Sequence, residues 1–209
     1  MIIKSKKNAL LSVFLIIGIL VIASCIISYF KKYHFFLAII LIIVIAFSLI
    51  RNFKTKKQNS SNFWLSFIGI FLTLSLGLVV EIWGTQNDYW IYLGLPQNIE
   101  IPFWVPFAWG LAYKALYKLE QALLTFFTTF SNKLIFCIIL PAIILPVLGE
   151  TVVIYYGVWR YTWQPQILGM PPLTILLLGI FHCSIFIIMC KICKLLSIND
   201  PVYSSFVKT

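Results

Sequence analysis

Two glutamates, each followed at one fixed spacing by a tryptophan and a tyrosine, are the residues best suited to chemistry. The two sets are Glu81 with Trp90 and Tyr92, and Glu150 with Trp159 and Tyr161. Each glutamate lies near the end of a long apolar run, where a carboxyl held away from water favours its protonated form. Such an acid can give a proton to a substrate and take one back. Glu81 and Glu150 are therefore our candidate catalytic residues, as general acid and general base.

The spacing extends beyond these residues into an internal repeat. Segments 81–102 and 150–171 align without a gap at an offset of 69 residues and share six identities. Besides the glutamate, tryptophan and tyrosine, these are a Pro-Gln pair and a final proline. That agreement exceeds what composition alone would give, so we interpret it as a duplicated unit.

The glutamates and the aromatic residues of the motif could also have purely structural roles, and the sequence does not decide between these roles and the chemical ones. A neutral glutamate can brace neighbouring helices by hydrogen bonding to a carbonyl or a tryptophan N–H. The aromatic residues of the motif fit the interfacial belt of a membrane protein, or the wall of a pocket for an apolar ligand or a transient carbocation. As candidate substrate-binding residues we take Trp90, Tyr92, Trp159 and Tyr161.

Two further residues join the candidate binding set. Arg160 lies between the second tryptophan and tyrosine, where it could pair with a glutamate or face solvent. His182 lies about eleven residues into the last apolar run, where it could exchange a proton with Glu150 or pack as a hydrogen-bonded core residue. With two histidines in the chain, no HExxH and no phosphate-binding glycine loop, we expect neither a metal nor a cofactor.

The fold that positions these residues is expected to be a membrane fold, because 61% of the 209 residues are hydrophobic and only 11% are charged. The apolar runs, each close to the ~20 residues that cross a bilayer, are 8–30, 33–50, 63–83, 102–118, 133–156 and 171–197. We expect an all-α bundle of six transmembrane helices with a duplicated two-helix unit. Within one integral membrane domain, 1–209, the parts are an N-terminal hairpin and basic loop (1–62), repeat unit 1 (63–131) and repeat unit 2 (132–199).

Charge sets the expected topology. The net charge of +10 comes from lysines and arginines between the apolar runs, as in topology signals, so we expect no nucleic-acid partner. Their bias places both termini in the cytoplasm and both motif loops outside, in what we expect to be a bacterial inner membrane with lipids as partners. Ile22–Cys25 has the look of a lipoprotein cleavage box, but the apolar run continues past it, so we expect the segment to stay.

The motif resembles that of small polytopic proteins of carotenoid metabolism, the small-subunit lycopene cyclases and the carotenoid hydratases. The resemblance covers residues 63–190 and rests on Glu81, Trp90-Ile91-Tyr92 and Pro102, and on Glu150, Trp159-Arg160-Tyr161 and Pro171. It implies a cyclase or hydratase, a lyase or isomerase type of enzyme, acting on an apolar isoprenoid lipid. Those cyclases carry an acidic pair after the proline, where this chain has Phe103-Trp104-Val105 and Pro172-Leu173-Thr174. The alternative is a non-catalytic protein that binds or transports a lipid or small molecule, or supports a membrane complex.

Overall fold

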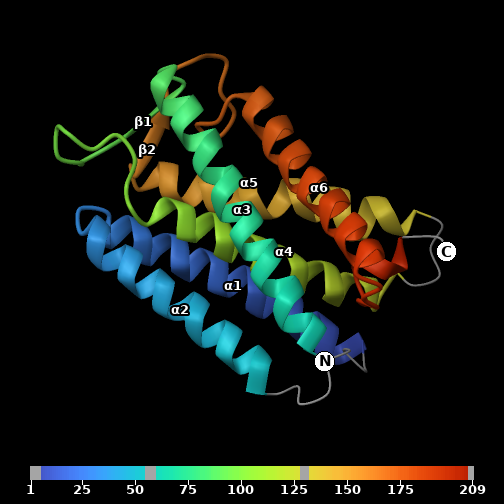
Figure 1. The fold of residues 1–209 in the computed structure, drawn as a ribbon. Helices are drawn as coiled ribbons and strands as arrows, with labels where there is room; N and C mark the ends of the chain where they lie inside the picture. The colour runs from blue at the N-terminus through green and yellow to red at the C-terminus, as the bar shows by residue number, and fades with distance from the viewer. Residues whose placement is uncertain (1–5, 55–59, 128–131, 207–209) are drawn as a thin grey trace.

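The protein is a bundle of helices in the computed structural model (Figure 1), which describes residues 6–54, 60–127 and 132–206, with backbone alone over 52–54 and 60–62. The helices are α1 (Lys6–Phe30), α2 (His34–Lys54), α3 (Ser60–Gln86), α4 (Val105–Leu124), α5 (Leu140–Tyr155) and α6 (Pro172–Leu195). The short elements are the strands β1 (Trp90–Tyr92) and β2 (Trp159–Tyr161), a π-helical segment η1 (Ile135–Ile139) and a 3-10 turn η2 (Tyr203–Ser205). The predicted all-α class is confirmed.

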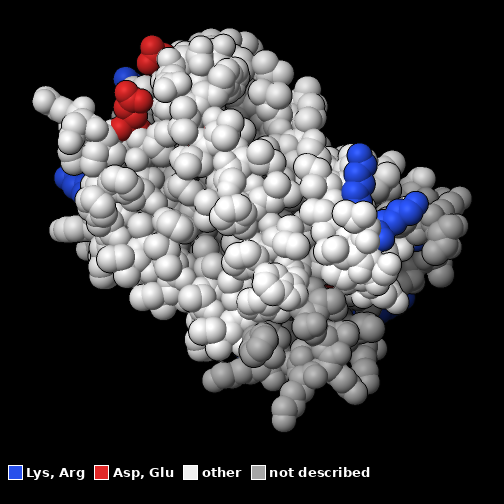
Figure 2. Space-filling model, in the orientation of Figure 1, with Lys and Arg blue, Asp and Glu red and all other residues white. Residues whose placement is uncertain are grey.

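Five of the helical segments are long and apolar enough to cross a membrane. They are Lys6–Phe30, His34–Arg51, Phe63–Gln86, Ile135–Tyr155 and Pro172–Leu195. Figure 2 shows the corresponding surface, a broad belt without charge between charged ends on the face in view. These features indicate an integral membrane protein. The sixth span and the division into repeat units stay predictions.

Helix α4 is the helix around which the bundle is arranged, since it packs against α1, α2, α3 and α5. This position explains how it can carry polar groups that would be costly next to lipid. Helix α4 continues to Leu124, and Glu120 is only 4% exposed. Residues 128–131 lie outside the described part.

The start of the fifth span departs from a regular α-helix. The π-helical segment η1 directly precedes α5, whose first turn contains Pro141, and Pro146 lies inside α5. A proline lacks the N–H that a helix needs and its ring crowds the preceding turn, so a widened turn before Pro141 accommodates it.

Helices α3 and α5 end in the same way before their strands. The N–H groups of Tyr89 and Val158 reach back to the carbonyls of Gly84 and Val153, each at 2.9 Å. Between them, Asp88 and Gly157 adopt left-handed backbone angles, with φ of 56° and 63°. This is a Schellman-type turn. All three pairs of positions differ by 69 residues, so both motif copies leave their helices by equivalent turns.

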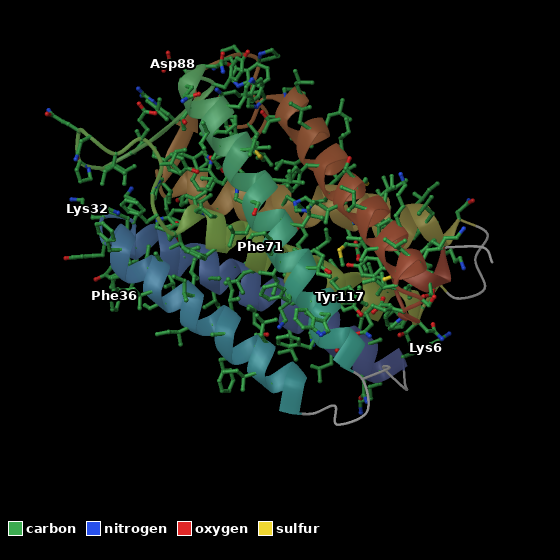
Figure 3. The ribbon with its side chains drawn as sticks, viewed as in Figure 1. Lys6, Lys32, Phe36, Phe71, Asp88 and Tyr117 are labelled. Atoms are coloured by element: carbon green, nitrogen blue, oxygen red, sulfur yellow. The ribbon has the colours of Figure 1, made fainter. Side chains whose placement is uncertain are left out.

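The N-terminal hairpin is attached to this end of the bundle by a lysine. The Lys31 ammonium donates hydrogen bonds to the carbonyls of Tyr156, at 3.0 Å, and Gly157, at 2.5 Å. Lys32 and Asp88 lie toward this same end in Figure 3, and Lys6 lies at the other. The connection between α1 and α2 thus holds the turn that leads into β2.

Candidate functional site

The two motif copies, far apart in sequence, meet as a pair of antiparallel strands. In the register of β1 and β2, Trp90 opposes Tyr161, Ile91 opposes Arg160 and Tyr92 opposes Trp159. The tryptophan of each copy therefore faces the tyrosine of the other, with ring centroids 5.8 Å and 5.5 Å apart. Matching hydrogen bonds extend the ladder at both ends, from Leu93 N to Val158 O and from Thr162 N to Tyr89 O.

Glu81, in the last part of α3, is held by three donors. Its Oε2 accepts hydrogen bonds from Trp90 Nε1 at 3.0 Å and from the Tyr92 hydroxyl at 2.8 Å. Its Oε1 accepts a hydrogen bond from Trp109 Nε1 of α4 at 2.9 Å. The side chain is 7% exposed. Both carboxyl oxygens are thus engaged, and the residue joins α3, β1 and α4.

Glu150 on α5 repeats most of this arrangement. Its Oε2 accepts hydrogen bonds from Trp159 Nε1 and from the Tyr161 hydroxyl, both at 3.1 Å. The position that aligns with Trp109 at the 69-residue offset is Leu178, whose side chain has no hydrogen to donate. The two acids therefore differ in one donor, and that difference lies on Oε1.

The hydrogen-bond network brings the two acids within electrostatic reach of each other and of both tyrosines. Burial raises the pKa of Tyr92 well above its ordinary value, and the charge of Glu81 adds to the rise. Burial, followed by the charge of Glu150, does the same for the pKa of Tyr161. Both hydroxyls consequently keep their protons at physiological pH and remain donors to the glutamates.

Two glycines of α3 make room for the tryptophans that reach Glu81. A Cβ on Gly84 would lie 1.8 Å from the Trp90 ring, and one on Gly77 would lie 2.4 Å from the Trp109 ring. Both distances are far below van der Waals contact, so a side chain at either position would displace an indole. Sequence reasoning did not assign Trp109 to the site, since only the first copy carries a tryptophan there. The signal available in the sequence was the pair of glycines, Gly77 and Gly84, along α3.

The remaining sequence candidates lie in different places. Arg160 is exposed on β2, with its backbone in the strand pair. His182 is buried on α6, with its ring stacked on that of Trp109 at a centroid distance of 6.0 Å. Whether His182 exchanges a proton with Glu150 stays a prediction. Through Trp109, however, His182 is adjacent to the network of Glu81.

Two cavities in the described parts of the chain lie away from Glu81 and Glu150, which line neither of them. One is a small cavity between α4, α6 and η2. The other has a volume of about 430 Å³ and lies among Tyr29, Phe30, Tyr33 and Phe36 at the connection of α1 and α2. Over the same described residues, no three His, Cys, Asp or Glu side chains are grouped to hold a metal.

Comparisons with protein-family models, with curated proteins and with solved structures find no match to this chain. Its function must therefore be argued from its own residues.

Proposed function

We propose that the protein is a non-catalytic, multi-pass membrane protein that supports a partner in the bacterial inner membrane. It has six spans, α4 included, a duplicated unit in spans three to six, and both termini in the cytoplasm. In this proposal the two motif copies form a rigid cap on the outer side. Lipids surround the apolar helices, and the cap offers a fixed surface to a membrane partner.

The observation that supports this proposal is that the polar groups of the motif form hydrogen bonds with one another. The N–H and O–H groups of all four motif aromatics donate to the two glutamates. The network links α3 to β1 and α5 to β2, and the strand pair joins the two halves. A buried polar network in which the donors and acceptors are matched gives rigidity and a unique arrangement. Equivalent use of both copies also supports the duplication.

An acid that protonates a substrate needs access to it. The N–H and O–H groups of the motif aromatics are already bonded to the two glutamates, and both described cavities lie elsewhere. This arrangement favours bracing over the aromatic-walled pocket that the sequence also allowed.

A second candidate is supported by the difference between the two acids. Oε1 of Glu150 lacks the counterpart of the Trp109 donor, so a protonated Glu150 could present its proton there while Glu81 remains the fully bonded base. This is the arrangement that proton transfer to an isoprenoid double bond would require, with Glu150 as acid. It would make the protein a lyase or isomerase of the type the carotenoid resemblance implies.

One experiment separates the two candidates. Lipids and pigments are profiled in a strain that lacks the gene and in strains complemented with wild type, Glu150→Gln or Glu100→Gln, the last being a control on an exposed loop residue. The non-catalytic proposal predicts the same profile in every strain. A precursor that accumulates without the gene and disappears with wild type and Glu100→Gln, but not with Glu150→Gln, would contradict it and support the enzyme.

A further inference from the structure

A second group of buried polar residues lies between α4, α6 and the C-terminal turn η2. The polar side chains around this small cavity are Tyr113, Tyr117, Glu120, His182 and Tyr203. The cavity has a volume of about 10 Å³, enough for about one water molecule. Neither motif glutamate lines this cavity, and His182, which does, reaches the Glu81 network only through the ring of Trp109.

Glu120 is the acid of this cavity. Its side chain is 4% exposed and lines the cavity, and among the described residues we find no donor that bonds its carboxyl. A buried carboxyl without a hydrogen bond is costly, so this group requires a partner that fits the space beside it.

The three tyrosine hydroxyls beside the cavity have one hydrogen left to donate to such a partner. Tyr117 donates to Asp200 Oδ2 at 2.7 Å, so its hydrogen is used. Tyr113 and Tyr203 share one hydrogen bond of 2.7 Å between their hydroxyls. Since that bond uses only one of their two hydrogens, the other is free to point into the cavity. A water there can accept this hydrogen and bond to Glu120 and His182, which meets the two to four partners that a buried water needs.

The hydrogen bonds around the cavity distinguish its acid from the neighbouring Asp200. Asp200, 2% exposed, lies within electrostatic reach of Glu120. It accepts three hydrogen bonds, from the N–H groups of Val202 and Tyr203 and from the Tyr117 hydroxyl. Both carboxyl oxygens of Asp200 are therefore already occupied by hydrogen-bond donors, whereas Glu120 has only the cavity. Glu120 is thus the acid of the pair that has space beside it for a water and an exchangeable proton.

We propose that this cavity is a proton-binding site, in which one water links the Glu120 carboxyl to His182 and to a tyrosine hydroxyl, and Glu120 carries an exchangeable proton. The titratable groups that face Glu120 are Tyr113 and Tyr117 on α4, Cys137 on η1, His182, Cys183 and Cys190 on α6, and Asp200 and Tyr203 of the C-terminal segment. The C-terminal turn closes the site, with Val202 fully buried and Tyr203 1% exposed.

Infrared difference spectra of the full-length protein between acidic and alkaline pH test the proposal. A protonated carboxyl gives its own C=O stretching band, which shifts in D₂O when its proton exchanges. We expect Glu120→Gln to remove one component of this band. Glu100→Gln, which alters an exposed loop acid, should leave the band intact. Bands from Glu81 and Glu150 are common to all these proteins and cancel in the comparison.

Three results would overturn the proposal. They are a Glu120→Gln spectrum identical to wild type, an assigned band that does not move in D₂O, and a band abolished by sodium at constant pH, which would make the site a cation site. If Glu120→Gln does not fold, Glu120→Asp serves instead. It keeps an acid but retracts it from the cavity, so the band should shift, and an unshifted band would count against the site.

Discussion

At the scale of single residues, the two motif glutamates look equivalent in sequence and differ in structure. Glu81 has donors on both carboxyl oxygens, and Glu150 has its motif donors on Oε2 alone. The difference arises because Trp109 aligns with Leu178. The same glutamate-to-glutamine substitution can therefore be compared at two sites that differ in their number of hydrogen-bond donors.

We expect Glu81→Gln to destabilise the protein more than Glu150→Gln does. A glutamine has one acceptor oxygen, so at position 81 its NH₂ group must meet one of three N–H or O–H donors. A donor left unpaired in a buried site costs about 1–3 kcal/mol. At position 150 the amide oxygen can keep both bonds. Denaturant unfolding of the purified variants in detergent measures the difference, and an equal or reversed order would contradict this account of the site.

At the level of the helices, the contact between α3 and α4 brings the Trp109 side chain of α4 within hydrogen-bond distance of Glu81 on α3. The indole lies over Gly77, where a Cβ would be 2.4 Å from its ring. The bond from Trp109 to Glu81 thus depends on a glycine one helix away from the tryptophan.

We expect Gly77→Ala to push α4 away from α3 and to break the Trp109–Glu81 hydrogen bond. Overpacking of this kind costs about 1–3 kcal/mol, despite the better helix propensity of alanine. The matched control is Gly18→Ala on α1, where a Cβ would have no atom within 4 Å. Thermal unfolding of both variants is the measurement. If Gly77→Ala is as stable as Gly18→Ala, the close packing that we describe is wrong.

At the scale of the whole molecule, the sequence predicted the apolar helices and the motif because both are local patterns. Composition and length specify apolar helices, and six identities at one offset define the motif and predict the repeat. How the copies meet was not predictable. Each strand has three residues, too few for a periodic signal, and its partner lies 69 positions away.

The C-terminal segment was missed for a related physical reason. The chain after Ser197 contains no long apolar run, yet Asp200, Val202 and Tyr203 are buried against α4 and α6. Its short sequence has no periodicity. What holds it is a turn capped by its own Asp200 and the hydroxyl pairing of Tyr203 with Tyr113. Such contacts between distant segments leave no local trace in the sequence, and the burial of Glu120 could not be predicted for the same reason.

The strands β1 and β2 join the two motif copies into one cap, and cysteine cross-linking across the strand pair tests this arrangement. Ile91→Cys with Arg160→Cys alters a directly opposed pair that takes no side-chain part in the glutamate network. Opposed residues on antiparallel strands stand roughly 4.5–5.5 Å apart between Cα atoms, within disulfide range. Leu93→Cys with Arg160→Cys, two residues out of register, is the control. We predict that mild oxidation of the membranes gives a 91–160 disulfide, identified by mass spectrometry, in preference to the control pair. Failure of the 91–160 pair to cross-link while both thiols remain reactive would contradict the account.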